Sequence, residues 1–122
     1  MKVLIVDDQP SMRMFLHHTV RRNHEVVGEA SNGVEAVDAV RTLRPDVVFL
    51  DIEMPVKGGI ESCVEIKASF PDVKVIMVTT KDKQEMIETA FEAGADDYIT
   101  KPIMGPEVLN KLAGIENDQD NV

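Results

Sequence analysis

Five short apolar runs alternate along the chain with five segments of helical periodicity. The runs cover residues 2–6, 25–29, 46–50, 73–79 and 98–100. An uninterrupted apolar run, such as the one from Val47 to Leu50, is typical of a strand that is covered on both faces of its sheet. Strands that alternate with helices form parallel sheets through right-handed crossovers. The sequence therefore predicts a doubly wound α/β domain with five parallel strands.

The segments between the runs repeat apolar residues at the spacing of one helix face. In the fourth segment, for example, one stripe is predicted to face the sheet: Met86, Ile87, Ala90 and Phe91. Two pairs have the spacing of a capping box at the start of a helix, Asn32 with Glu35 and Asp82 with Glu85. The strand order expected for this alternation is 2-1-3-4-5, the order of flavodoxin-like (βα)5 folds.

The composition narrows the setting and the partners of such a domain. With 122 residues, the chain is expected to form one domain. Its 22 acidic and 13 basic side chains give a net charge of −9, which disfavours direct contact with nucleic acid or with an anionic membrane. Cys63 is the single cysteine, and no apolar run has the length of a membrane span, so a cytoplasmic protein is expected. The folded domain is predicted over residues 1–115, followed by an acidic, disordered tail at 116–122.

Polar residues close four of the five apolar runs. Asp7 and Asp8 follow the first run, Asp51 the third, Thr79 the fourth and Lys101 the fifth. Because the carboxyl ends of parallel strands lie along one edge of the sheet, these side chains are expected to meet there. Three carboxylates, a hydroxyl and an ammonium suit metal-assisted phosphoryl transfer in which an aspartate is the group phosphorylated.

An aspartate can accept an anionic phosphoryl group only if their repulsion is offset. Asp8 and Asp51 can bind Mg²⁺ directly, with Asp7 holding a coordinated water, and Mn²⁺ can substitute. Lys101 offers a positive charge to one phosphoryl oxygen, and Thr79 offers a hydroxyl donor to another. The sequence therefore predicts a magnesium-dependent phosphoacceptor site.

Four motifs in register resemble the response-regulator receiver domain, and the resemblance covers essentially all of residues 1 to 115. They are Val-Asp-Asp at 6–8, Leu-Asp-Ile-Glu-Met-Pro at 50–55, Val-Thr-Thr at 78–80 and Gly-Ala-Asp-Asp-Tyr-Ile-Thr-Lys-Pro at 94–102. The resemblance implies a two-component signalling protein that receives its phosphoryl group from a histidine kinase. The chain departs from the usual pattern at Gly58 and Ile103, and neither change removes a chemical group from the site.

The resemblance also implies a role for each residue of the site. Asp51 is the phosphoacceptor, and Asp7 and Asp8 are the metal-binding acids, with the backbone carbonyl of Glu53 as the third protein ligand. Thr79 and Tyr98 are the switch pair. Lys101, joined to Pro102 by a cis peptide, contacts the phosphate. Such a domain is not expected to be an enzyme beyond promoting its own phosphorylation and dephosphorylation.

A signalling face is predicted where the fourth helix, the fifth strand and the fifth helix meet. It is expected to present Ile87, Tyr98 and Val108 beside Lys111, which suits a short amphipathic peptide with an acidic side chain. Residues 11–13 and 79–87 resemble the stand-alone chemotaxis regulators of the family, so a target such as a flagellar-motor switch protein is expected. Receivers of winged-helix transcription factors dimerise through this face and need a basic residue where this chain has Ile87, so a monomer is expected.

Glu53 and Lys81 are predicted to tune the lifetime of the phosphoryl group. Each lies two residues beyond a residue of the site. An ion pair between them would hinder the water that hydrolyses the aspartyl phosphate. Because an exposed pair contributes only about 0 to 1 kcal/mol to stability, the expected effect is kinetic. A phosphatase is also among the expected partners.

Other protein classes share parts of this pattern. An FMN-binding electron carrier needs Ser, Thr and Gly donors after its first strand, whereas residues 7–10 are Asp-Asp-Gln-Pro. A phosphatase with an aspartyl nucleophile needs a pocket for the organic part of its substrate. Among receivers, a stand-alone phosphorelay intermediate and the receiver of a DNA-binding response regulator share the same site. A chain that begins at Met1 and ends in a polar tail favours a stand-alone protein.

Overall fold

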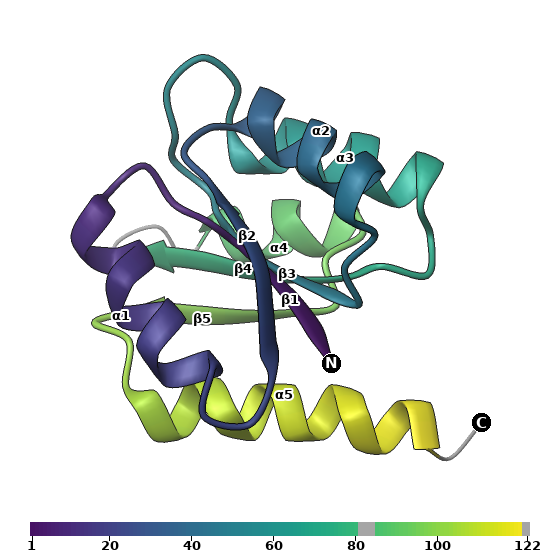
Figure 1. Cartoon of the computed structure of the whole chain (residues 1–122). Coiled ribbons are helices and arrows are strands. Elements are labelled where there is room, and N and C mark those ends of the chain that lie inside the picture. The colour runs from purple at the N-terminus through teal and green to yellow at the C-terminus, as the bar shows by residue number, and fades with distance from the viewer. Residues whose placement is uncertain (81–84, 121–122) are drawn as a thin grey trace.

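The sheet has the topology that the sequence predicts. The structure is a computed structural model that describes residues 1–80 and 85–120 (Figure 1). Within these residues the strands are β1 (Lys2–Val6), β2 (Glu25–Ala30), β3 (Val47–Asp51), β4 (Lys74–Thr80) and β5 (Asp97–Lys101). Every neighbouring pair is parallel, and the order is β2-β1-β3-β4-β5. The predicted flavodoxin-like fold is confirmed.

The helices lie in two layers, one on each face of the sheet (Figure 1). They are α1 (Pro10–Val20), α2 (Gly33–Leu43), α3 (Gly59–Ser69), α4 (Glu85–Glu92) and α5 (Gly105–Asp120). One layer holds α2, α3 and α4, and the other holds α1 and α5. No helix in the described part of the chain is long and apolar enough to cross a membrane.

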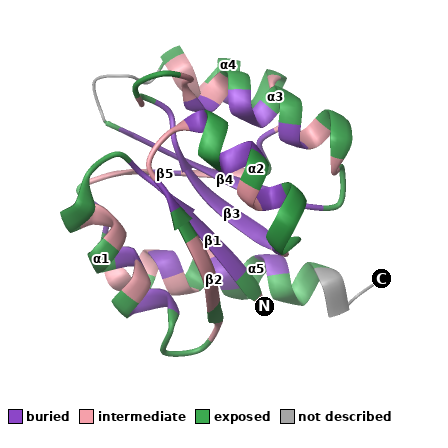
Figure 2. Cartoon of the chain, turned by 45° about the horizontal axis from the view of Figure 1, so that its top comes forward, coloured by how far each residue is buried: buried purple, intermediate pink, exposed green. Residues whose placement is uncertain are grey.

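The strands divide their side chains between two cores. Leu4 and Leu50 pack toward the layer of α2, α3 and α4, whereas Ile5 and Phe49 pack toward α1 and α5. Figure 2 shows the central strands as the most buried part of the molecule. All five residues of β3 are buried, which explains why this run lacks polar alternation. Two filled cores hold the strand ends in fixed positions.

The start of α2 uses the predicted cap in a modified form. The Asn32 side chain accepts a hydrogen bond from the backbone N–H of Glu35 at 3.0 Å. The Glu35 carboxylate, however, accepts from the backbone N–H and the hydroxyl of Ser31 instead of the backbone of Asn32. The second predicted pair, Asp82 with Glu85, involves a residue that lies outside the described residues.

The last helix is longer than the sequence predicts. The disordered tail was expected to begin at residue 116, but α5 continues to Asp120. Leu112 and Ile115 anchor the helix in the core, and no proline or glycine follows Ile115. Each further residue then adds one backbone hydrogen bond at little cost, because the helix is already nucleated. The predicted boundary at 115 therefore falls inside a helix.

Candidate functional site

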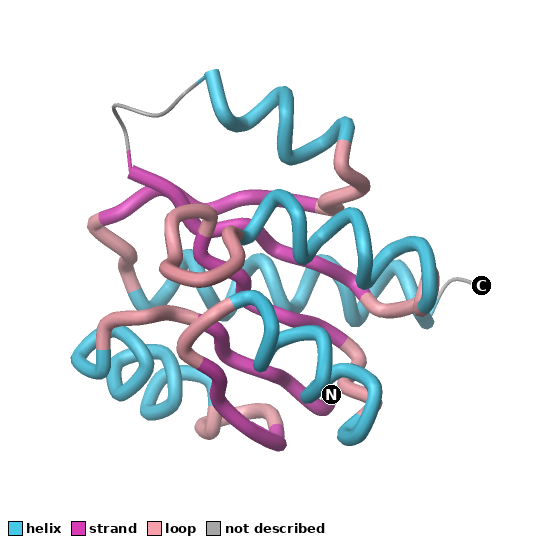
Figure 3. The backbone as a smooth tube through the Cα atoms, turned by 90° about the horizontal axis from the view of Figure 1, so that it is seen from above, coloured by secondary structure: helices cyan, strands magenta, loops and turns pink. Residues whose placement is uncertain are grey.

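Three carboxylates meet at the carboxyl ends of two adjacent strands. Asp7 and Asp8 follow β1, and Asp51 ends β3, which pairs with β1. One oxygen from each of these side chains lies within 4.8 Å of the other two. Asp7 and Asp51 are buried, while Asp8 is exposed. Figure 3 shows the loops at these strand ends gathered on the side of the molecule opposite the N-terminus. The predicted convergence of the acids is present in the structure.

The acids repel one another in the absence of a cation. Burial raises the pKa of Asp51 from its ordinary value of 3.8 to about 7, the charge of Asp7 acts in the same direction, and Lys101 opposes both. The N–H of Gln9 donates to one oxygen of Asp7 at 2.9 Å. The other oxygen of Asp7 is buried and has no hydrogen-bond partner. A carboxylate oxygen left in this way, beside two further acids, fits a divalent cation with oxygen ligands.

Lys101 supplies the positive charge of the site from the end of β5. Its Nζ lies 3.4 Å from Oδ2 of Asp7 and 3.7 Å from Oδ2 of Asp51. These separations place it in ion-pair range of both acids, although the approach to Asp7 does not form a hydrogen bond. The peptide bond from Lys101 to Pro102 is cis, as expected. Lys101 therefore places one positive charge beside both buried acids.

Thr79, near the end of β4, borders the same space. Its side chain is buried, and its hydroxyl donates a long hydrogen bond of 3.4 Å to the carbonyl of Thr80. A cavity of about 200 Å³ is lined by Asp8, Gln9, Asp51, Ile52, Glu53, Thr79, Thr80 and Lys101. Pockets for organic ligands usually enclose roughly 300 to 1,000 Å³. This cavity suits a phosphoryl group with a hydrated cation better than a cofactor such as FMN.

The loop after Asp51 is held close to β3. A Cβ on Gly59 would lie 2.1 Å from the carbonyl oxygen of Asp51, so only glycine fits there. The N–H of Gly59 donates to the carbonyl of Ile52 at 2.8 Å. Gly58 caps α3 without a side-chain hydrogen bond, because glycine has no side chain that could accept one. The loop keeps its close approach to β3 without that cap.

Glu53 lies beside the phosphoacceptor candidate, on the same loop. Its backbone N–H donates to the Asp51 carboxylate, and the residue lines the cavity. This places the backbone of Glu53 next to the predicted metal site. Its proposed partner Lys81 lies outside the described residues, so the predicted ion pair stays a prediction.

The predicted signalling face differs from the expectation in two residues. Val108 lies on the inner face of α5 and is completely buried in the core, so it cannot contact a partner. Phe91, which was expected to face the sheet, is instead 44% exposed and packs edge-on against Tyr98, with ring centroids 6.0 Å apart. The Lys111 ammonium lies 5.8 Å from the centre of the Tyr98 ring and pairs with Asp97 at 3.0 Å.

Phe91 and Ile87 therefore give this face its apolar character. Ile87 is partly exposed on α4, one turn before Phe91. Helical periodicity places both on one stripe, but it does not show how far the sheet extends beneath them. The face thus combines two apolar side chains of α4 with the aromatic ring of Tyr98 and the cation of Lys111.

Comparison with known proteins identifies the family. The family model described as the response regulator receiver domain matches residues 3–113. The chain belongs to this family. It is 40% identical over 114 residues to the chemotaxis protein CheY of Halobacterium salinarum, a match that covers 93% of this chain and 95% of that protein.

Solved structures of receivers superpose closely on this chain. The response regulator domain of Thermotoga maritima CheB has a TM-score of 0.88 at 38% identity, with 96% of each chain covered. CheY of Borrelia burgdorferi, solved in a complex with CheX, BeF₃ and Mg²⁺, has a TM-score of 0.88 at 28% identity, with 93% of this chain and 87% of that chain covered. Membership of the family supports a phosphoacceptor role in two-component signalling, with a histidine kinase as donor and a downstream target.

Proposed function

We propose that Asp51 is phosphorylated by a histidine kinase in a Mg²⁺-dependent reaction. The observation that carries this proposal is the meeting of Asp7, Asp8 and Asp51 around a buried oxygen with no hydrogen-bond partner. Asp7, Asp8, Asp51 and the backbone carbonyl of Glu53 would hold the metal. When bound, Mg²⁺ or Mn²⁺ neutralises the acids and the phosphoryl oxygens.

The reaction requires a deprotonated Asp51 as the nucleophile. One carboxylate oxygen forms the new bond to phosphorus as the bond from phosphorus to the histidine nitrogen breaks, and the histidine takes up a proton. Lys101, already near Asp51 and Asp7, turns to a phosphoryl oxygen as the negative charge of the site grows. Thr79 gives up its long hydrogen bond and donates to another oxygen. The domain promotes this transfer and its own dephosphorylation, and it is not an enzyme for other substrates.

Phosphorylation is read out through the face of α4, β5 and α5. Movement of the Thr79 hydroxyl toward the phosphoryl group opens space for Tyr98, whose ring now rests against Phe91 and beneath Lys111. The altered face binds an amphipathic peptide with an acidic side chain. The similarity to chemotaxis proteins named CheY favours a chemotaxis target, such as a flagellar-motor switch protein.

Two other receiver roles use the same site. The similarity to the response regulator domain of CheB favours a receiver that can also serve as part of a larger protein. A stand-alone phosphorelay intermediate would pass the phosphoryl group on to a second histidine. In the described structure Lys111 pairs with Asp97 of the same chain, which leaves it less available to pair across a dimer of the transcription-factor type.

The signalling face can be tested with the beryllofluoride-activated protein. We expect a monomer by sedimentation, with peptide binding that increases about 5- to 150-fold on activation, equivalent to about 1 to 3 kcal/mol of coupling. Tyr98→Ala and Lys111→Ala should lose this gain, because both remove surface from the proposed contact. Lys57→Ala, which changes a lysine that pairs with Glu65 elsewhere on the molecule, is the control. A stable symmetric dimer through this face would instead favour the transcription-factor role.

A further inference from the structure

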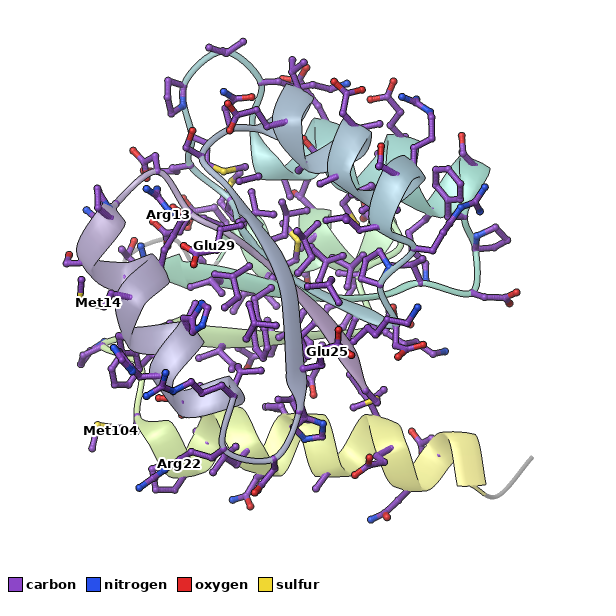
Figure 4. The ribbon with its side chains drawn as sticks, viewed as in Figure 1. Arg13, Met14, Arg22, Glu25, Glu29 and Met104 are labelled. Carbon is purple, nitrogen blue, oxygen red and sulfur yellow. The ribbon has the colours of Figure 1, made fainter. Side chains whose placement is uncertain are left out.

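Arg13 links the metal-site loop to the neighbouring strand. Its Nη1 donates a hydrogen bond of 2.7 Å to the backbone carbonyl of Asp7. Its Nε lies 3.3 Å from one carboxylate oxygen of Glu29 on β2, and Nδ1 of His17, one turn further along α1, lies 3.0 Å from the other. Figure 4 shows Arg13 and Glu29 reaching toward each other from α1 and β2. None of these residues lines the cavity of the site.

The Arg13 contact completes the fixing of the Asp7 backbone. The N–H of Asp7 already donates to the carbonyl of Ala30 at 3.1 Å, and Arg13 holds the carbonyl on its other side. That carbonyl belongs to the peptide plane that joins Asp7 to Asp8. A rotation of this plane would move Asp8, whose side chain is exposed. The hydrogen bond from Arg13 therefore sets where the second acid of the site points.

Glu29 fixes the position of the Arg13 guanidinium and offsets its charge. The Arg13 guanidinium contacts the backbone of Asp7, next to the carboxylates of Asp7 and Asp8. Without Glu29 it could act as a counter-ion for these carboxylates and compete with a divalent cation. The Glu29 carboxylate offsets that charge and holds the group on the β2 side, where it reaches a carbonyl of the loop. Because the pair is partly exposed, its contribution to folding stability is small. The main effect of the pair of Arg13 and Glu29 is expected on the orientation of Asp8 and on the net charge near the acids.

We infer that Arg13 and Glu29 are positioning residues for the metal site: Arg13 orients Asp8 through the Asp7 carbonyl, and Glu29 keeps Arg13 in that position and away from the acids. This inference rests on the proposed Mg²⁺ site. Outer-shell partners of metal ligands commonly change metal affinity by about 10- to 100-fold. Because Arg13 acts through the backbone, its removal is expected to have an effect near the lower end of that range.

The test is the Mg²⁺ dissociation constant, measured by titration calorimetry on the whole chain. Arg13→Met and Glu29→Gln should each weaken Mg²⁺ binding by roughly tenfold. The double variant should be no weaker than Arg13→Met alone, because Glu29 acts through Arg13. Arg13→Lys retains the charge and should recover part of the affinity. Arg22→Met, which changes an exposed arginine just after α1 that is far from the acids, should match the wild type (Figure 4).

Two further readings separate positioning from a structural role. Melting temperatures without Mg²⁺ should stay close to the wild type, and phosphoryl uptake should recover at saturating Mg²⁺. Unchanged Mg²⁺ affinity in both single variants would overturn the inference, as would additive losses in the double variant. If the wild type itself bound no Mg²⁺, the proposed function would fail. A wild type that binds Mg²⁺ beside variants with the same affinity would remove only the role of Arg13 and Glu29.

Discussion

Asp51→Asn is expected to stabilise the metal-free protein against unfolding at pH 8. At this pH the folded protein holds Asp51 as a buried anion beside Asp7, and the pKa of about 7, raised from 3.8 mainly by burial, expresses the cost. Asparagine keeps the shape and removes the charge. At about 1.36 kcal/mol per pH unit, the interval from 3.8 to about 7 corresponds to roughly 4 kcal/mol, which is an upper value for the gain in the free energy of unfolding.

The pH dependence of this gain has a definite sign. Between about pH 4 and about pH 7, folded Asp51 holds a proton that the unfolded chain has already released. Raising the pH through this interval therefore lowers the stability of the wild type relative to Asp51→Asn, and the difference levels off above pH 7. Urea unfolding with EDTA present measures it, with Asp38→Asn, an exposed acid on α2, as the control. A difference that shrinks as the pH rises would show that Asp51 is not the strained anion.

Asp8→Asn is expected to weaken Mg²⁺ binding by at least about tenfold, equivalent to about 1.4 kcal/mol. Asp8 is the exposed member of the three acids, so its charge carries little desolvation cost and serves mainly to attract the cation. The same variant should take up phosphoryl groups correspondingly more slowly at low Mg²⁺. Its stability without metal should change little, in contrast to Asp51→Asn.

Calorimetric titration with Mg²⁺ and with Mn²⁺ gives the comparison for Asp8. Asp7→Asn should cause a smaller loss than Asp8→Asn, because Asp7 is expected to act through a coordinated water. Asp38→Asn again serves as the control. Equal affinities for the wild type and Asp8→Asn would mean that Asp8 is not a ligand and that the cation, if it binds, lies elsewhere.

Much of the site could be predicted because strand ends carry it. The uninterrupted run that ends at Asp51 indicated a buried central strand, and parallel topology then placed its end on the same edge of the sheet as Asp7. The pairing of β1 with β3 brings the two residues next to each other. The fold followed from the same alternation. Neither inference depended on side-chain detail. The crossover rule and the apolar pattern predict a doubly wound parallel sheet, whereas the order β2-β1-β3-β4-β5 was expected as the common arrangement for five strands and is established by the structure.

The errors arose where packing extent decides the outcome. Val108 and Phe91 both lie on apolar stripes, yet one is fully buried and the other is 44% exposed, because periodicity does not reveal the width of a helix contact. The contact between Arg13 and Glu29 joins residues 16 positions apart, on a helix and on the strand after it. No local pattern in the sequence indicates that pair. Only the position of α1 against β2 brings it together.

Phosphoryl uptake from a small donor is the most direct measurement of the proposed function. Incubation with acetyl phosphate and Mg²⁺, followed by intact-mass analysis and peptide mapping, should show one acid-labile phosphoryl group on the peptide that contains Asp51. Uptake should disappear with EDTA and should be lost in Asp51→Asn, while Asp38→Asn should behave as the wild type. Uptake by Asp51→Asn at the wild-type rate, or a group mapped to another residue, would contradict Asp51 as the phosphoacceptor.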